Sequence, residues 1–269
     1  MAKLIVRGLE TNVEVWNESA EQVLVALHGF TGSTATWRNL ATKLPNVRIV
    51  AIDCIGHGKT AVPEDESRFT MEQQVKDLEE IVSQLHVEKF TLLGYSMGGR
   101  IALSYAIAYP ERIHKLILES ASPGLRTEKE RNERRQSDRL LAEKIERYGI
   151  SSFVDAWEKI ALFDSQKRLP NNVQQAIRKE RLAQSVAGLA GSLRGLGTGM
   201  QPSNWPYLAN LDVPVLLITG AMDEKFCRIA SEMQALIKNA HHVTVNDVGH
   251  AIHVENPAEF ATIVEKYFM

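Results

Sequence analysis

The residues around Ser96 carry the strongest chemical signal in this chain. Residues 94–98 read GYSMG, a G-x-S-x-G pattern that holds a serine hydroxyl exposed on a sharp turn between a strand and a helix. Apolar runs predict that strand at 90–95 and that helix at 97–109. The pattern also occurs by chance in glycine-rich turns, but here it has the context that the chemistry requires. The glycines permit the bend, and the helix amino terminus adds a positive partial charge near the serine oxygen.

A base and an acid that could activate Ser96 follow later in the chain. His250 comes after the last predicted strand and is the favoured base, while Asp223 follows the strand predicted at 213–220. Catalytic groups of open α/β sheets gather at the carboxyl ends of strands, and such an acid fixes the histidine tautomer and favours the imidazolium. His253 is a rival base with an expected packing role, and Glu119 is a rival acid. Structural roles are favoured for His57, His241 and His242, and Glu224 is expected to point elsewhere.

Backbone amides near Ser96 are expected to stabilise negative charge. Residues 28–32, HGFTG, close the strand predicted at 23–29. In this arrangement that loop donates one N–H to an oxyanion and the residue after the nucleophile donates another, which assigns the two donors to Phe30 and Met97. Preorganised donors of this kind strongly favour a developing oxyanion. His28 is expected to bond to the backbone, and we also place it among the substrate-binding residues.

The elements that must position these groups alternate between apolar strands and amphipathic helices. After an N-terminal hairpin, the expected strands are 23–29, 47–53, 90–95, 114–120, 213–220 and 242–245. The expected helices are 34–43, 71–85, 97–109, 224–237 and one from about Pro257. This rhythm predicts a parallel sheet with helices on both faces, formed by a single domain over residues 1–269.

The alternation stops at about Ala121, where we predict an inserted helical lid over residues 121–205. Residues 127–190 are charged and helical in period, and the glycine-punctuated stretch 188–199 is expected to be the exit from the lid. The lid contains 15 Lys and Arg against 10 Asp and Glu. Ten of those 15 are arginines, which favours an anionic ligand because guanidinium groups grip carboxylates in a bidentate fork.

Composition excludes several classes of protein. The chain has 44% hydrophobic and 24% charged residues and a formal net charge of -2, so neither nucleic acid nor an anionic membrane is an expected partner. Cys54 and Cys227 have no metal-ligand spacing, and a disulfide framework is not expected. No stretch of about 18 apolar residues predicts a spanning helix, and the N-terminal residues do not read as a signal peptide. We expect a cytoplasmic protein, and the sequence leaves its oligomeric state open.

These motifs together resemble the α/β-hydrolase superfamily over nearly the whole chain. The resemblance rests on the HGF loop, the three triad residues in the order Ser96, Asp223, His250, the GYSMGG turn, and the DCIGHG loop at 53–58. It implies a mostly parallel eight-stranded sheet with helices on both faces and an inserted helical lid. The DCIGHG loop is expected to be a structural turn near the pocket mouth, since it lacks the pattern of a phosphate-binding loop.

Three further segments resemble the 2-succinyl-6-hydroxy-2,4-cyclohexadiene-1-carboxylate synthases of menaquinone biosynthesis. They are residues 94–100, residues 120–138, and residues 181–199 with their RLAQ and SLRGLGTG runs. The resemblance implies a lyase that removes an acidic proton from a polycarboxylate and eliminates pyruvate without a metal or an organic cofactor. It assigns carboxylate binding to Arg100, Arg134 and Arg181, and pocket positions to Tyr95 and Trp157. Nearby arginines leave two of these assignments open, namely Arg131, Arg135 and Arg139 beside Arg134, and Arg178 and Arg194 beside Arg181.

Arg100 also stands out on physical grounds, because a cation on the first turn of a helix opposes the helix dipole. A ligand carboxylate would explain its position. In the expected mechanism His250 and Asp223 keep Ser96 basic, and Ser96 removes the substrate proton. Two alternatives remain open at this point: a carboxylesterase or carbon–carbon-bond hydrolase that uses the same triad, and a non-catalytic ligand receptor on this fold.

Overall fold

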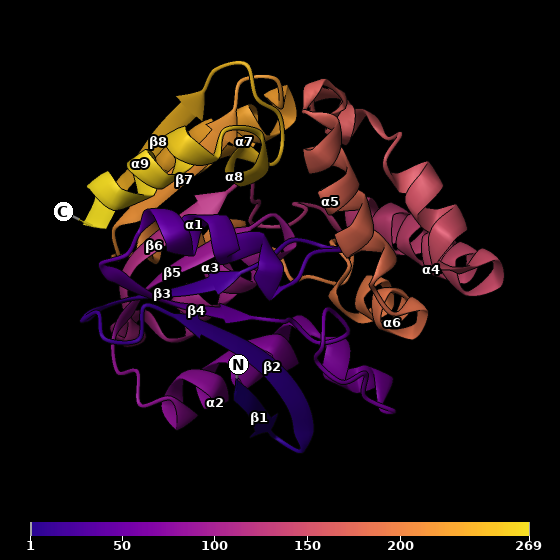
Figure 1. Ribbon diagram of the computed structural model, residues 1–269, viewed down its shortest axis with the longest axis horizontal. Helices are drawn as coiled ribbons and strands as arrows, with labels where there is room; N and C mark the ends of the chain where they lie inside the picture. Colours follow the sequence, from indigo (N-terminus) through magenta and orange to yellow (C-terminus); the bar gives the residue numbers. More distant parts are fainter. Residues whose placement is uncertain (1, 269) are drawn as a thin grey trace.

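A mixed sheet forms the centre of the molecule in the computed structural model, which describes residues 2–268 (Figure 1). Within that range the eight strands lie in the order β1-β2-β4-β3-β5-β6-β7-β8. The β1–β2 and β2–β4 pairs are antiparallel and all other pairs are parallel, so the predicted mostly parallel eight-stranded sheet is confirmed. The strands are β1 (Ala2–Val6), β2 (Leu9–Trp16), β3 (Gln22–Leu27), β4 (Val47–Ile52), β5 (Phe90–Tyr95), β6 (Ile113–Glu119), β7 (Val215–Gly220) and β8 (Ala240–Val245).

Helices cover both faces of the sheet, as the alternating pattern predicts. On one face α2 (Met71–Gln84), α3 (Met97–Ala108) and α7 (Glu224–Leu236) share a hydrophobic core with the strands. On the other face α1 (Arg38–Lys43) and α9 (Pro257–Phe268) pack over a second core. Burial on both faces explains why β5 and β7 read as continuous apolar runs. The shorter helices of this part are η1 (Thr34–Trp37), η2 (Glu66–Phe69), η3 (Pro110–Arg112), η5 (Trp205–Asn210) and α8 (Ile252–Glu255).

The lid leaves the sheet after β6 and returns before β7. It consists of α4 (Glu128–Trp157), η4 (Ala161–Arg168), α5 (Asn171–Leu182) and α6 (Val186–Leu196), which stand beside the sheet in Figure 1. A capping box between Thr127 and Glu130 fixes the start of α4. The helices share a small apolar core of their own. The single domain 1–269 and its lid 121–205 stay predictions as units, and residues 1 and 269 lie outside the described range.

The glycine-punctuated stretch after residue 187 is a packed helix, whereas the sequence suggested only an exit from the lid. A side-chain carbon on Gly188 would come within 2.1 Å of the Gly56 carbonyl oxygen, and one on Gly191 or Gly195 would meet Phe69 at 2.6 or 2.5 Å. The glycines of α6 therefore serve close packing of the lid on the core. Glycine has a low helix propensity, but contacts of α6 with α4 and η2 stabilise the helix in spite of its glycines.

Parallel pairing brings the ends of four strands to one edge of the sheet. β3, β5, β6 and β7 are parallel neighbours, so the segments that follow them emerge side by side. These segments contain the HGFTG loop, Ser96, Ser120 and Asp223. The sheet therefore creates one place at which residues far apart in the sequence can meet, and the lid lies over it.

Candidate active site

Ser96 lies at the bend between β5 and α3 in a strained backbone conformation, with φ +50° and ψ −106°. A side-chain carbon on Gly94 would come within 2.4 Å of the Gly98 carbonyl oxygen, and one on Gly98 within 2.3 Å of the Leu27 carbonyl oxygen. Close backbone approach therefore requires both glycines. The result is a hydroxyl that projects from the end of the strand at the amino terminus of a helix, where a negative charge is favoured.

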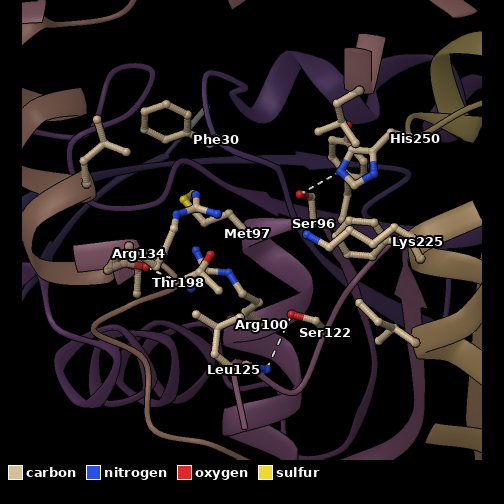
Figure 2. A pocket seen from close by; sticks show the side chains of 18 of the residues that line it. Phe30, Ser96, Met97, Arg100, Ser122, Leu125, Arg134, Thr198, Lys225 and His250 are labelled. Carbon is tan, nitrogen blue, oxygen red and sulfur yellow. Dashed lines mark hydrogen bonds between the residues drawn. The ribbon is translucent and has the colours of Figure 1, made fainter. Parts of the chain in front are cut away.

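The structure brings Ser96, His250 and Asp223 together. His250 Nε2 lies 3.0 Å from Ser96 Oγ (Figure 2), and His250 Nδ1 lies 2.6 Å from Asp223 Oδ2. The other Asp223 oxygen accepts the Phe226 N–H at 3.3 Å and so caps α7. One carboxylate thus anchors a helix and orients the imidazole, and this geometry can transfer a proton from the serine to the ring. The catalytic roles of the three residues stay predictions.

Glu255 holds the loop that carries His250. One of its carboxylate oxygens accepts the Gly249 N–H at 2.7 Å and the other accepts the Ala251 N–H at 3.3 Å. These backbone groups flank His250 on both sides. The imidazole is therefore fixed through its own loop as well as through Asp223, and its ring is 1% exposed.

The rival acid and base form a separate buried pair. His253 Nδ1 lies 2.9 and 2.8 Å from the two oxygens of Glu119, which also accepts the His253 backbone N–H at 3.0 Å. The His253 ring packs against Tyr95 and Trp37, with centroids 4.6 and 5.0 Å apart. Both partners are buried. This pair supports the floor of the site beneath Tyr95.

His28 is a structural residue of the HGFTG loop and not, as predicted, a substrate contact. Its ring is fully buried, its Nε2 accepts the Cys54 N–H at 3.0 Å, and its Nδ1 therefore donates to the Gly29 carbonyl oxygen at 2.7 Å. Burial lowers the pKa of His28 to about 4. With both nitrogens occupied and the side chain outside the Ser96 cavity, the neutral ring ties the loop to the strand end after β4.

The two residues assigned to the oxyanion hole flank Ser96. A side-chain carbon on Gly29 would lie 2.6 Å from the Tyr95 ring and 3.6 Å from Ser96 Cβ, so the loop that carries Phe30 rests directly on the nucleophile turn. Met97 is the first residue of α3, where a backbone N–H has no acceptor within the helix. Both residues line the cavity beside Ser96. Their role as amide donors stays a prediction that this arrangement permits.

Ser96 and His250 open into a cavity of about 220 Å³ with two different ends. His250 and Ser96 form one end, and Arg100 and Arg134 lie on the opposite side in Figure 2. We call these the triad end and the arginine end. The walls between them are largely apolar, as in a site that holds a small molecule away from water. The larger apolar side chains are Phe30, Trp157, Phe163, Leu193, Leu196 and Phe226.

Arg100 is a buried cation that forms no direct ion pair with a carboxylate of the described residues. Its side chain donates to the Leu196 carbonyl oxygen at 2.9 Å and to Gln201 Oε1 at 3.0 Å, both neutral groups. The nearby carboxylate of Asp138 is paired with Arg134 and favours the Arg100 charge without a direct ion pair. Burial, assisted by the nearby Arg134 and opposed by Asp138, lowers the pKa of Arg100 to about 10. Because a buried unpaired charge is costly, this end of the cavity favours an anionic ligand.

Arg134 and Trp157 also line the cavity. Arg134 Nε donates to Asp138 Oδ1 at 2.7 Å, which fixes the side chain on the wall. The Trp157 indole N–H is buried without a hydrogen-bond partner among the described residues. A buried donor of this kind needs an acceptor, which a ligand in the cavity can supply. Tyr95 lines the same cavity, and burial raises the pKa of its hydroxyl well above the usual range, so the phenol is neutral.

Arg181 is not brought together with Arg100 and Arg134. It lines an adjoining cavity, where its guanidinium stacks on Phe163 at 4.5 Å and donates to Gln166 Oε1 at 3.1 Å. The two cavities share a wall, because Phe30, Tyr95 and Phe163 line both of them. Most other lid arginines pair with acids near the surface, as a solvated helical face does. These pairs are Arg131–Glu128, Arg135–Glu128, Arg139–Glu143, Arg178–Asp155 and Arg194–Glu146.

The sequence reasoning missed Lys225, Phe163, Phe226 and Ser122, all of which line the cavity. Lys225 had a usable signal, since it is a cation on the first turn of α7 and only two residues beyond Asp223. The dipole argument that singled out Arg100 applies equally to it. The two phenylalanines had no such signal, because an aromatic residue of a helix reads as core until its neighbours are known.

The described residues do not group three or more His, Cys, Asp or Glu side chains in a way that could hold a metal ion. Residues 2–268 also contain no helix that is long and apolar enough to cross a membrane.

Known proteins resemble this chain in sequence and in structure. A family model described as alpha/beta hydrolase fold matches residues 22–257. A Bacillus subtilis (strain 168) protein, provisionally named as a 2-succinyl-6-hydroxy-2,4-cyclohexadiene-1-carboxylate synthase, is 48% identical over 93% of this chain and 91% of its own. The synthase of that name from Enterobacter sp. (strain 638) is 32% identical over 88% of each chain. The structure of MenH from S. aureus matches with a TM-score of 0.91 and 40% identity over 96% of this chain and 97% of its own. A thermophilic esterase from Thermogutta terrifontis, with a TM-score of 0.85 and 24% identity over 97% and 93% of the two chains, shares the fold.

Proposed function

The chain belongs to the 2-succinyl-6-hydroxy-2,4-cyclohexadiene-1-carboxylate synthases of the α/β-hydrolase fold, and from this premise we propose how its cavity carries out the reaction. It is a lyase of menaquinone biosynthesis. Its substrate is 2-succinyl-5-enolpyruvyl-6-hydroxy-3-cyclohexene-1-carboxylate, from which it eliminates pyruvate. One observation carries the proposal. The same cavity is lined by Ser96, whose hydroxyl is hydrogen-bonded to His250, and by the buried Arg100, which has no direct carboxylate partner.

Proton abstraction begins at the triad end. Ser96 Oγ gives its proton to His250 Nε2, from which it is 3.0 Å away, and then takes the proton from ring carbon 2 of the substrate. That proton is acidic because carbon 2 carries the succinyl ketone. Asp223, 2.6 Å from Nδ1, stabilises the imidazolium that forms. Ser96 therefore acts as a base and forms no bond to the substrate.

Elimination follows from the position of the ring double bond. The electron pair of the broken C2–H bond forms a C2=C3 bond, the C3=C4 bond moves to C4=C5, and the C5–O bond breaks. The enolpyruvyl group leaves as the enolate of pyruvate and receives on its carbon the proton held by His250. Protons balance, and the ring is left as the 2,4-diene of the product. The chemistry as written needs no oxidant or reductant.

The negatively charged groups of the substrate would be bound at both ends of the cavity. The Phe30 and Met97 N–H groups would bind the ketone oxygen as negative charge develops on it. Arg100 and Arg134 would bind a substrate carboxylate, which also neutralises the buried charge of Arg100. The Trp157 N–H is a further donor for the ligand. Arg181 would bind the substrate after a movement of the shared wall, of which Phe163 carries the Arg181 guanidinium on its ring.

Pyruvate release tests this proposal. The purified chain is given the enolpyruvyl substrate, and pyruvate is measured by coupled reduction to lactate. We expect pyruvate and diene to form in equal amounts, and Ser96→Ala to lower the rate roughly 10³-fold or more because the base is lost. Ser137→Ala, on the exposed surface of α4, is the matched control and should leave the rate unchanged. Equal rates for Ser96→Ala and the control would exclude Ser96 as the base.

Ester hydrolysis is the second candidate, favoured by the close Ser96–His250 contact and by the fold shared with esterases. A hydrolase would form an acyl bond to Ser96 Oγ during turnover. Intact-mass measurement of the enzyme during turnover separates the two reactions. Elimination leaves the mass unchanged, whereas acyl transfer adds the mass of the acyl group, which Ser96→Ala removes.

We also propose a cytoplasmic location and a small polycarboxylate as the partner, with no nucleic acid and no stable membrane insertion. Two observations support this. Cys54 and Cys227 are both free thiols, as is usual in a reducing compartment, and the chain has a net charge of only -2.

A further inference from the structure

The loop that carries Phe30 has a backbone conformation that its sequence does not favour. The Gly32 N–H donates to the Gly29 carbonyl oxygen at 3.0 Å and closes a tight turn, in which Thr31 has a φ of +70°. A β-branched residue is strained in this left-handed region, and such strain persists only where the surroundings hold it in place. Contacts with the surrounding structure must therefore hold this turn in place.

The core holds the loop at its two ends. His28 is bonded to the Cys54 N–H at one end, as described above, and Asp53 Oδ1 accepts the Thr34 N–H at 2.6 Å at the other end. Neither contact reaches the carbonyl oxygen of Gly32, next to the strained Thr31.

The lid supplies the contacts that the core does not. Gln184 follows α5 and is buried, and its Nε2 donates to the Gly32 carbonyl oxygen at 3.1 Å. Its Oε1 accepts the Gly58 N–H at 3.0 Å. One lid side chain therefore joins the Phe30 loop to the DCIGHG turn of the core.

A second lid residue binds the same loop one turn earlier along α5. Glu180 Oε1 accepts hydrogen bonds from Ser33 Oγ at 2.6 Å and Thr36 Oγ1 at 3.2 Å. These two hydroxyls cap and begin η1, directly after the strained turn. Gln184 also donates to the Glu180 carbonyl oxygen at 3.3 Å, so the two side chains form one connected set of contacts.

We propose that Gln184 and Glu180 are positioning residues that hold the Phe30 N–H in the oxyanion hole only while α5 is docked on the core. The inference rests on the proposed function, because it deepens the role given there to Phe30. When α5 is docked, the carbonyl oxygen of Gly32 is held and the strained turn keeps the Phe30 amide beside Ser96. When α5 leaves, the turn relaxes and the amide is displaced. Docking of the lid thus completes the charge-stabilising part of the site.

The test uses a probe that reports on the oxyanion hole without the lyase reaction. Phenylboronic acid accepts an electron pair from Ser96 Oγ on its boron, the serine proton goes to His250, and one boron-bound oxygen occupies the oxyanion position. Its dissociation constant is measured for the wild type, Gln184→Ala, Glu180→Ala and Glu180→Gln, together with kcat and KM for pyruvate release and the Tm. Lys179→Ala, exposed on the same helix, is the matched control.

In Gln184→Ala we expect boronate affinity and kcat to fall together by roughly 10- to 100-fold, the size of effect given by a misplaced oxyanion donor. KM should change little, because the arginine end is intact, and the Tm should fall modestly because the Gly32 carbonyl oxygen and the Gly58 N–H lose a buried partner. Glu180→Ala should show a smaller loss of the same kind. Glu180→Gln should restore most of it, since an amide oxygen still accepts from both hydroxyls. Lys179→Ala should match the wild type.

Several outcomes overturn the inference. Unchanged boronate affinity in Gln184→Ala does so, as does a rise in KM alone, which would mean that the contact only shapes the pocket. A wild type that does not bind the boronate has no assembled oxyanion hole and also overturns it. If the wild type releases no pyruvate but boronate affinity still depends on Gln184, the proposed reaction fails and the positioning role stands.

Discussion

The triad end and the arginine end of the cavity are held in different ways. At the triad end the side chains emerge from strand ends, and the triad side chains and their loop have protein partners: Asp223 for His250, His250 for Ser96, and Glu255 for the loop. At the arginine end the buried Arg100 has neutral hydrogen-bond partners and no direct acid partner. On the wall between the two ends, the indole N–H of Trp157 has no partner among the described residues. The hydrogen bonds of the triad are therefore formed without a ligand, whereas the charge of Arg100 would be neutralised by a bound ligand.

This difference predicts separate kinetic signatures. Interactions already satisfied in the empty protein can act on the chemical step, so their loss should lower kcat. Groups whose charge or hydrogen bond is satisfied only by a ligand contribute to substrate binding, so their loss should mainly raise KM. Variants at the triad end should therefore mainly change kcat, and variants at the arginine end should mainly change KM. A variant that changes both constants equally would show that the two ends are coupled.

The largest effect is expected at the triad end, for Asp223→Asn. The amide still caps α7, but it presents an N–H to His250 Nδ1 and favours the wrong tautomer. We expect kcat for pyruvate release to fall roughly 10³- to 10⁴-fold with little change in KM. Glu224→Gln, on the adjacent and largely exposed side chain, is the control and should keep full activity. A raised KM with normal kcat in Asp223→Asn would contradict the assignment of this acid.

A smaller effect is expected at the arginine end, for Arg100→Met, which keeps most of the volume and removes the charge. Loss of a charge-assisted contact should raise KM roughly 10- to 100-fold, with a smaller fall in kcat if the contact tightens in the transition state. The Tm should not fall much, because a costly buried charge is removed at the same time.

Arg139→Met is the matched control for this variant, since Arg139 is an exposed lid arginine paired only with Glu143 at 3.5 Å. It should leave KM unchanged. Equal KM values for Arg100→Met and Arg139→Met would mean that no substrate carboxylate binds at Arg100.

Much of the core could be predicted from the sequence because periodicity and turn chemistry are local signals. The strand at 90–95 and the start of α3 at Met97 follow from apolar residues and the flanking glycines, and both are found at those residues. The sequence favoured Asp223 but left Glu119 as a rival, because both acids follow predicted strands and both lie between Ser96 and His250 in the chain. The structure shows the physical reason for choosing Asp223, since Glu119 is occupied by His253.

The lid could be predicted only coarsely, because its details depend on contacts between distant segments. Nothing local to Arg181 shows that it lines a different cavity from Ser96. The helix α6 depends on glycines that meet Phe69, more than 100 residues away in the sequence. His28 was misassigned for the same reason: its partner at Nε2 is the backbone of Cys54 on another strand end.

The last predicted effect concerns stability at acid pH. It should arise in the core beside the Phe30 loop and not in the lid. His28 and His57 lie beside the Phe30 loop, and none of the eight histidines lies within residues 121–205. Burial, assisted by the nearby His28, lowers the pKa of His57 to about 3. Below the unfolded pKa of about 6.5 the unfolded chain binds protons that the folded chain does not, so stability is full above that pH and is lost on acidification.

For His57 alone, the free energy of unfolding should fall by about 2 kcal/mol between neutral pH and pH 5. Urea unfolding at a series of pH values measures this slope. His57→Gln removes the titrating group, so its slope should be shallower by that amount even if its stability at neutral pH is lower. His114→Gln, an exposed histidine at the start of β6, is the control and should keep the wild-type slope. If His57→Gln kept the full slope, acid sensitivity would come from other groups and His57 would not be held neutral by its burial in the core.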